Sequence, residues 1–218
     1  MELQAERLRA NFSDVGVAFL AHRPYPDEVL PSLQGARVFV VPMFMAEGHF
    51  TRVALPAAVG LGASAARPVT ICAALGAGEG LAEVILGRAV AACREHGLAP
   101  NRTSVVLAAH GSRDNPASRC AATAQSERLA GSGRFAAVRV AFLEEAPSLP
   151  TALEALDGDV LVVGLFALPG GHAEHDIPAI IAAERGRRRG RTVYTGAVGA
   201  DPAIANAVLD LVENAAAR

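Results

Sequence analysis

The sequence has few cysteines and no long apolar run. Its three cysteines, Cys72, Cys93 and Cys120, are scattered and form no C-x-x-C pair. This pattern is typical of a reducing cytoplasm and gives no support to an iron–sulfur cluster or a cysteine-built zinc site. No stretch approaches the roughly 18 apolar residues that span a bilayer, and the charged start, Met1–Arg7, is unlike a signal peptide. We therefore expect a cytoplasmic protein without a membrane span.

Basic charge and nucleotide motifs are also scarce. The formal net charge is −2, so no global basic field indicates a nucleic-acid partner. The glycines at 76, 78 and 80 follow an apolar run, but a dinucleotide-binding loop would need glycine where Leu81 stands. We interpret this stretch as a turn and expect no bound nucleotide. The chain also lacks a G-x-S-x-G elbow, which makes a hydrolase with Ser112 as nucleophile a weak interpretation.

What the chain does contain is an internal repeat. The segment Val17–Leu20 recurs as Val140–Leu143, a shift of 123 residues, and in the same register Gly76 meets Gly199. After a one-residue slip between these points, further pairs align: Val40 with Val162, Phe44 with Phe166, Gly48 with Gly170 and Pro56 with Pro178. A chain of 218 residues with a twofold repeat favours two lobes of about 100 residues. We expect one lobe over 1–100 and the other over 101–218.

Short apolar runs alternate with helical patterns in both repeats. Continuous runs of this kind are typical of parallel strands covered on both faces, so we expect an α/β fold whose two similar lobes each hold a small, mainly parallel sheet flanked by helices. The expected strands lie at 16–20, 37–45, 68–75, 104–109, 137–143, 159–168 and 192–198. The expected helices lie at 1–11, 80–95, 116–131, 148–156, 177–185 and 202–216, the last with Asp201 as its N-cap.

The first repeat begins one strand late. The counterpart of His110 would fall about 22 residues before Met1. Either the first lobe lacks its first strand, or Met1 is not the natural start. A missing strand would expose a sheet edge that a second subunit could cover, which makes a homodimer a reasonable hypothesis. A monomer in light scattering would contradict it.

Ionisable residues of the second repeat follow three of its expected strands. His110 follows the first run, Glu144 and Glu145 the second, and His172 the third. Because the carboxyl ends of parallel strands share one edge, these groups can converge on a divalent metal or on a proton to be removed. The first repeat has Ala21 and Phe50 where the second has Glu144 and His172. The second lobe is therefore the expected catalytic lobe and the first a lid.

The same residues resemble the motifs of a known family. His110-Gly111-Ser112-Arg113 resembles the opening motif of the sirohydrochlorin chelatases, and Phe142-Leu143-Glu144 resembles their second motif. The stretch Gly170-x-His172-x-x-x-Asp176-Ile177-Pro178 is similar to their third. The resemblance covers essentially all of 104–218, and the first half resembles the degenerate half of duplicated members.

The resemblance implies a class II, ATP-independent chelatase, a metal-inserting lyase. Such enzymes insert Co²⁺ or Fe²⁺, of which Co²⁺ is the first expectation here, into sirohydrochlorin or a related tetrapyrrole on the way to cobalamin or sirohaem. By the same resemblance, His110 and His172 would hold the metal or take pyrrole protons, assisted by Glu144. Glu145 is an alternative, because the family's second motif usually has one more residue before the proline. The rival hypothesis is a protein that binds or delivers tetrapyrrole or metal without catalysis.

Neighbouring residues leave further alternatives. Arg113, with Ser112 beside it, is the candidate for contacting the tetrapyrrole, because guanidinium groups suit carboxylates. His172 could bind metal with His175 and Asp176 alone, but a helix cap at Asp176 and a solvated His175 are the preferred interpretation. The basic run 185–191 is interpreted as a solvated loop away from the site. In the first lobe, His22 and His49 could face the cleft.

Overall fold

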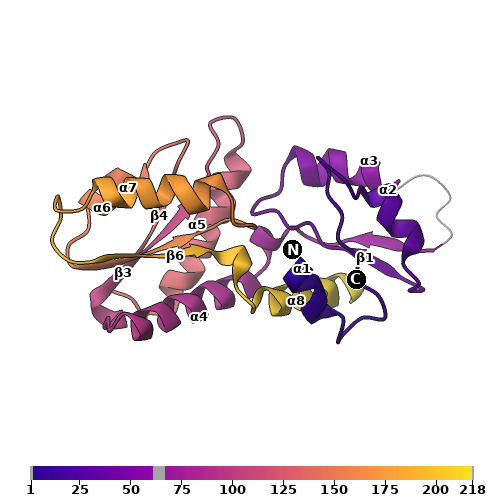
Figure 1. Ribbon diagram of the computed structural model, residues 1–218, viewed down its shortest axis with the longest axis horizontal. Coiled ribbons are helices and arrows are strands. Elements are labelled where there is room, and N and C mark those ends of the chain that lie inside the picture. Colours follow the sequence, from indigo (N-terminus) through magenta and orange to yellow (C-terminus); the bar gives the residue numbers. More distant parts are fainter. Residues whose placement is uncertain (1, 61–66, 218) are drawn as a thin grey trace.

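The computed structural model describes residues 2–60 and 67–217 and shows two lobes side by side along the long axis of the molecule (Figure 1). The larger lobe contains a four-stranded sheet in the order β4-β3-β5-β6, and all neighbouring strands are parallel. Its strands are β3 (Thr103–Ala109), β4 (Ala137–Phe142), β5 (Asp159–Gly164) and β6 (Thr192–Ala197). The helices between them are α5 (Pro116–Gly131), α6 (Leu149–Glu154) and α7 (Ile177–Ala183). The predicted α/β fold with parallel strands is confirmed.

Both faces of this sheet are covered. Leu107 and Val163 face one buried cluster, whereas their neighbours Val106 and Val162 face another. Successive residues of a strand point to opposite faces, so a strand covered twice must be apolar throughout. All of β3 is buried accordingly. This double covering is the physical reason for the continuous apolar runs in the sequence.

The smaller lobe has a two-stranded parallel sheet of β1 (Val38–Val40) and β2 (Val69–Ile71). Its other elements are α1 (Glu2–Leu8), α2 (Pro26–Val29), α3 (Leu55–Val59) and the short turns η1 (Leu30–Ser32), η2 (Phe50–Ala54) and η3 (Leu75–Ala77). The predicted strand at 16–20 is wrong, because this segment has no strand assignment. Its counterpart β4 pairs only with β3, and none of the described residues of the first repeat aligns with β3. Within the described residues, the segment 16–20 therefore has no such strand to pair with, and the homodimer stays a prediction.

The last helix of each repeat packs across the boundary between the repeats. Helix α4 (Gly80–Glu95) contacts α5, β5 and β6 of the second repeat, whereas α8 (Ile204–Ala216) contacts α1 of the first as well as α4. In Figure 1, α4 lies beneath the larger sheet and α8 lies beside α1. The predicted boundary at residue 100 falls at the start of the turn η4 (Pro100–Arg102). The closing helix of each repeat nevertheless packs against the other repeat.

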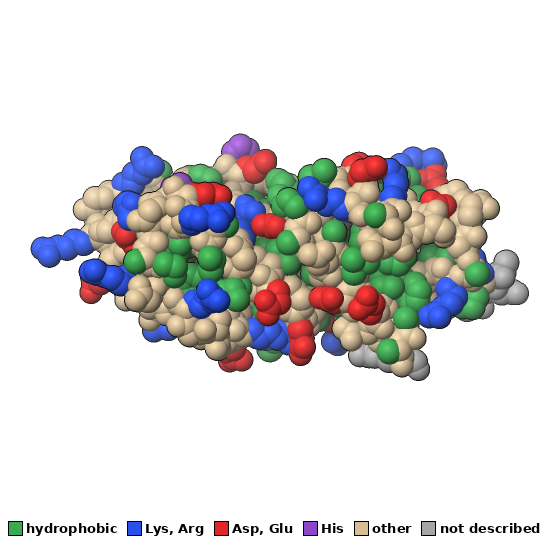
Figure 2. All heavy atoms as spheres, turned by 90° about the horizontal axis from the view of Figure 1, so that it is seen from below, with side chains coloured by type: hydrophobic (Ala, Val, Ile, Leu, Met, Phe, Trp, Pro, Cys, Tyr) green, Lys and Arg blue, Asp and Glu red, His purple; other side chains and the backbone are tan. Residues whose placement is uncertain are grey.

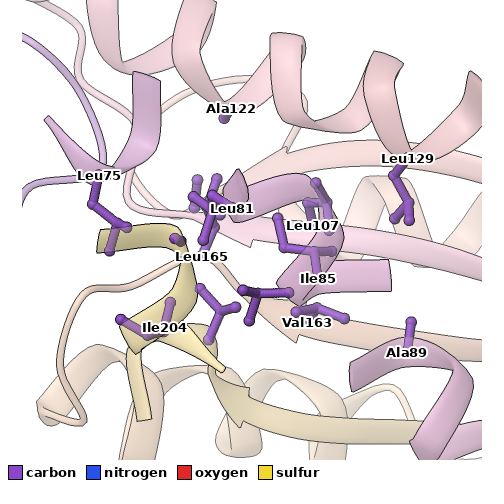
Figure 3. Close-up of a cluster of buried hydrophobic side chains, with 14 of the residues drawn as sticks. Leu75, Leu81, Ile85, Ala89, Leu107, Ala122, Leu129, Val163, Leu165 and Ile204 are labelled. Atoms are coloured by element: carbon purple, nitrogen blue, oxygen red, sulfur yellow. The ribbon is translucent and has the colours of Figure 1, made fainter. Parts of the chain in front are cut away.

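The exchange produces one core shared by both repeats (Figure 3). Leu81, Ile85 and Ala89 of α4 are fully buried and point toward Leu107 of β3 and Val163 of β5. Burial of each large aliphatic side chain contributes about 1.5–3 kcal/mol. The two repeats are therefore expected to unfold as one cooperative unit.

Two local predictions needed correction. Helix α8 begins at Ile204 rather than at Pro202, because Asp201 accepts a hydrogen bond from the Ala203 backbone N–H (2.9 Å) in a turn that follows η6 (Val198–Ala200). The basic run is not freely solvated. Arg188 donates to the carbonyls of Leu156 and Gly158, and Arg191 pairs with Asp159. These arginines anchor the loop that enters β6.

On the face that carries α4 and α8, basic and acidic side chains are interspersed, with apolar patches between them (Figure 2). Within the described ranges, none of the helices is both long enough and apolar enough to cross a membrane.

Candidate active site

The structure brings two of the predicted site residues together at the carboxyl edge of the larger sheet. His110 directly follows β3, and His172 opens the π-helical turn η5 (His172–Asp176) after β5. Their ring centroids are 4.7 Å apart and the rings meet edge to face at 80°. Because β3 and β5 are adjacent parallel strands, the segments that follow them begin at the same edge of the sheet and bring the two imidazoles close together.

Each imidazole has one nitrogen already engaged. His110 Nδ1 lies 2.9 Å from the Gly111 carbonyl oxygen, and His172 Nδ1 lies 2.6 Å from Asp176 Oδ2. A carbonyl or carboxylate oxygen only accepts, so Nδ1 carries the hydrogen in both rings. In the neutral rings Nε2 therefore keeps its lone pair. That nitrogen can bind a metal ion or accept a proton.

The two candidate carboxylates have different surroundings. Glu145 accepts a hydrogen bond from the Ser112 backbone N–H (3.0 Å) and forms an ion pair with Arg119, and only 9% of its side chain is exposed. Glu144 is exposed, and its backbone N–H donates to the His110 carbonyl oxygen (3.0 Å). Glu145 thus holds the turn after β3, which leaves the Glu144 carboxylate as the one open to a ligand.

Glu144 is not gathered with the histidines into a metal-binding cluster. Across residues 2–60 and 67–217, no three His, Cys, Asp or Glu side chains are arranged to hold a metal ion. The two imidazoles and Glu144 reach the same edge from separate strand ends. A ligand entering the cleft would have to draw Glu144 toward the histidines, so its role stays a prediction.

Ser112 and Arg113 both take part in the turn that follows His110. The Ser112 hydroxyl accepts a hydrogen bond from the Asn115 backbone N–H (3.0 Å), and Arg113 Nε donates to the Glu144 carbonyl oxygen (3.0 Å). The guanidinium of Arg113 is exposed and keeps two further nitrogens for a ligand. The predicted tetrapyrrole contact is therefore open to Arg113 and remains untested for both residues.

The predicted helix cap at Asp176 is wrong. Asp176 has helical backbone angles and makes no side-chain cap, because the helical path already begins in η5. Its carboxylate pairs with His172 instead. Asp176 is therefore a partner of His172 that sequence reasoning assigned to the helix end.

A hollow of about 190 Å³ lies between the lobes beside His110. The smaller lobe contributes Met43, Phe44 and Met45 to its lining, and the larger lobe contributes Phe166. The sequence predicts the first lobe as a lid but does not single out these three residues, although the repeat alignment of Phe44 with Phe166 was a signal for one of them. Of the candidate histidines, the lining that the structure describes includes His110 but not His22, His49 or His172.

A stacked pair of rings lies on each side of the hollow, around Phe166 in the larger lobe and around Phe44 in the smaller one. Phe166 and His172 are stacked with centroids 6.4 Å apart, and Phe44 and Phe50 are stacked at 6.0 Å. Phe50 stands at the position of His172 in the repeat and is 57% exposed. The smaller lobe thus presents an apolar surface where the larger lobe presents imidazole.

Comparison with known proteins gives the family of this chain. The model of the family described as CbiX matches residues 1–92 and again 104–215, which together make up most of the sequence. The chain belongs to the CbiX family. The two matched segments coincide with the two repeats, and the predicted resemblance to the sirohydrochlorin chelatases is confirmed.

Relatives of this CbiX-family chain are chelatases or chelatase-like proteins. A protein of Halobacterium salinarum named probable sirohydrochlorin cobaltochelatase is 28% identical over 240 residues, which cover 94% of this chain and 81% of that protein. The solved structure of CbiX described as the terminal enzyme of sirohaem biosynthesis in denitrifying bacteria has a TM-score of 0.79 and 27% identity, covering 98% of this chain and 90% of that one. The multi-domain protein DR2241 of Deinococcus radiodurans is described as structurally similar to chelatases. Its structure matches 95% of this chain with a TM-score of 0.82 and 27% identity, and the match covers 49% of DR2241.

Proposed function

We propose that this chain is a sirohydrochlorin chelatase, which inserts a divalent metal into sirohydrochlorin or a closely related tetrapyrrole without ATP. The observation that carries the proposal is the pair of imidazoles, 4.7 Å apart, of which His110 lines the hollow between the lobes. Family membership and the relatives named as chelatases support it. Both the metal ion and the tetrapyrrole are substrates in this reaction.

Insertion requires two proton transfers. The entering dication replaces two pyrrole N–H protons, so the ring gains one metal ion and releases two protons. The Nε2 atoms of His110 and His172, left free by the Nδ1 contacts, would accept those protons or hold the metal before transfer. The carboxylate of Glu144, which has no side-chain partner within the described residues, would balance the charge of the incoming ion.

The macrocycle would rest across the mouth of the hollow. At about 190 Å³, the hollow is smaller than the roughly 300–1,000 Å³ pockets that enclose drug-sized ligands. A flat tetrapyrrole ring is too large to be enclosed in this hollow. It would therefore lie between the lobes, with the stacked rings of Phe44 and Phe50 against one face. The exposed guanidinium of Arg113 would meet a peripheral carboxylate of the ring.

Metallation kinetics test the proposal. The tetrapyrrole absorption spectrum, followed after addition of Co²⁺, should change rapidly with the wild-type protein, and His110→Ala combined with His172→Ala should lower the rate by about 10²-fold or more. The control is His96→Ala, which removes an exposed histidine at the end of α4. Equally slow metallation by wild type and the double variant would contradict catalysis and favour the binding or delivery protein instead.

For the metal, we propose Co²⁺ as the substrate, with Fe²⁺ as the competitor. Sites with nitrogen and oxygen ligands bind Co²⁺ more tightly than Fe²⁺, and the relative from Halobacterium salinarum is named for cobalt. Initial rates with each metal at equal concentration under anaerobic conditions compare them directly. A larger kcat/KM with Fe²⁺ would contradict this choice.

A further inference from the structure

One turn of the larger lobe supplies both His172 and the group that orients it. The π-helical turn η5 begins with His172 and ends with Asp176, and the Ile177 backbone N–H donates to the His172 carbonyl oxygen. Within this turn His172 Nδ1 and Asp176 Oδ2 are 2.6 Å apart. The side chains are 46% and 55% exposed, so both members of the pair are accessible from solvent.

The first repeat contains the same turn without the pair. The turn η2 is also π-helical, and the Leu55 backbone N–H donates to the Phe50 carbonyl oxygen. The preceding hydrogen bonds match as well, from Arg52 to Gly48 (2.9 Å) in one repeat and from Glu174 to Gly170 (2.8 Å) in the other.

In the repeat alignment Phe50 takes the place of His172, and Ala54 takes the place of Asp176. The turn therefore forms without a carboxylate at this position. Asp176 is not needed to build the helix start, and it is present in the repeat that has the histidine.

The carboxylate fixes two properties of the imidazole. By accepting the Nδ1 hydrogen it selects the tautomer whose Nε2 has a free lone pair, and it holds the ring at one rotation about its side chain. That rotation sets the 80° contact with His110. His110 obtains the same tautomer from the Gly111 carbonyl oxygen, so the two rings are prepared by different acceptors.

We propose that Asp176 is a positioning residue that orients His172 and keeps its Nε2 available to the reaction. The effect on turnover rests on the chelatase function proposed above, whereas the effect on the tautomer does not. Removal of a carboxylate that orients a metal-binding histidine lowers activity or metal affinity about 10–100-fold.

Two substitutions separate charge from hydrogen bonding. Asp176→Ala removes the acceptor, whereas Asp176→Asn keeps an oxygen that can accept from Nδ1. The control is Glu174→Ala, which removes another exposed carboxylate of the same turn. Thermal unfolding of each variant checks that it is folded.

The first measurement is the tautomer of His172 in protein labelled with ¹⁵N-histidine, without metal or tetrapyrrole, at a pH where imidazoles are neutral. The signal is assigned by its loss in His172→Ala. We expect the Nδ1–H form in the wild type, Asp176→Asn and Glu174→Ala, and a shift toward the Nε2–H form in Asp176→Ala. An unchanged tautomer in Asp176→Ala would overturn the proposal.

The second measurement is the rate of metallation. Asp176→Ala should lower kcat about 10–100-fold with a nearly unchanged KM for the tetrapyrrole, and Asp176→Asn should recover most of that loss. Equal kcat in wild type and Asp176→Ala would overturn the positioning role. If the wild type does not metallate at all, the chelatase function fails, and the tautomer measurement still decides whether Asp176 orients His172.

Discussion

The two repeats share their hydrogen-bonded turns but differ in the side chains that those turns present. The Gly76 backbone N–H donates to the Phe44 carbonyl oxygen and that of Gly199 donates to Phe166, both at 2.9 Å. Likewise, the Phe19 backbone N–H donates to the Pro24 carbonyl oxygen at 2.8 Å, and the Phe142 backbone N–H donates to the Pro147 carbonyl oxygen at 2.9 Å.

At the cleft, however, the larger lobe has imidazoles and carboxylates where the smaller lobe has phenylalanine and alanine. The comparison shows that the two repeats can keep the same backbone hydrogen bonds while their side chains at the cleft differ. Main-chain hydrogen bonds need no particular side chain, so the smaller lobe keeps these turns of the larger lobe while presenting an apolar surface.

The largest effect in this comparison is expected at the paired glycines. A β-carbon at Gly76 would lie 1.9 Å from the Met45 carbonyl oxygen, and one at Gly199 would lie 2.0 Å from that of Ala167. Backbone atoms cannot easily move away from an added β-carbon. Gly76→Ala and Gly199→Ala should therefore each lower the free energy of unfolding by about 3 kcal/mol. Urea denaturation measures both.

Gly87 provides the matched control for these glycines. It lies within α4, and an added β-carbon there would meet nothing within 4 Å. Gly87→Ala should be neutral or stabilise the protein by up to about 1 kcal/mol. A loss at only one of Gly76 and Gly199 would break the equivalence of the two turns.

An intermediate effect is expected at two glutamines that join the repeats. Gln125 of α5 is fully buried and donates to the carbonyls of Gly76 and Gly78, both at 2.9 Å. Gln4 of α1 donates to Gly199 (3.3 Å) and Asp201 (2.8 Å). Each glutamine thus ties a helix of one repeat to the closing turn of the other.

Leucine at either position would leave two carbonyl groups without these donors. Gln125→Leu and Gln4→Leu should each lower the free energy of unfolding by about 1–3 kcal/mol, with the larger loss at the fully buried Gln125. Chemical denaturation of the two variants side by side is the test. A larger loss of unfolding free energy at Gln4 would show that the hydrogen bonds from α1, rather than those from α5, contribute more to holding the repeats together.

The smallest effect is expected at the ion pair that anchors β5. The hydrogen bond from Arg191 lowers the pKa of Asp159. A folded-state pKa below the unfolded value stabilises the protein above the unfolded pKa of about 3.9, and this contribution disappears as the pH falls through the folded pKa. The Arg191 side chain is 56% exposed, so solvent weakens the pair.

Asp159→Asn should therefore cost less than about 1 kcal/mol at pH 7. The difference from the wild type should shrink as the pH is lowered below about 4. Urea denaturation at several pH values measures it. A constant difference down to pH 2 would mean that packing, rather than charge, accounts for the loss.

Much of the larger lobe follows from local sequence. Helix α5 was predicted at 116–131 and forms at Pro116–Gly131, and helix α4 was predicted at 80–95 and forms at Gly80–Glu95. Apolar periodicity and end signals are local, so they can be read directly. The strand predicted at 16–20 was wrong because a strand depends on a neighbour, and none of the described residues of the first repeat forms a counterpart of β3 beside it.

The candidate site was predictable only in part. The approach of His110 to His172 follows from two adjacent parallel strands that end at one edge. The choice between Glu144 and Glu145 did not follow, because it depends on Arg119 and on the Ser112 backbone. The pairing of Asp176 with His172 was missed because a carboxylate before Ile177-Pro178 also suits a helix cap.

By itself, the sequence determined the repeat, the parallel α/β lobes and the histidines at the strand ends. These properties depend on the order of apolar runs and on residues a few positions apart. Only the tertiary structure decided that α4 and α8 close opposite lobes, that Glu145 is held by the turn after β3, and that the cleft has an apolar wall. Each of these depends on contacts between segments far apart in the chain, where packing and hydrogen bonding select one arrangement among several that local sequence permits.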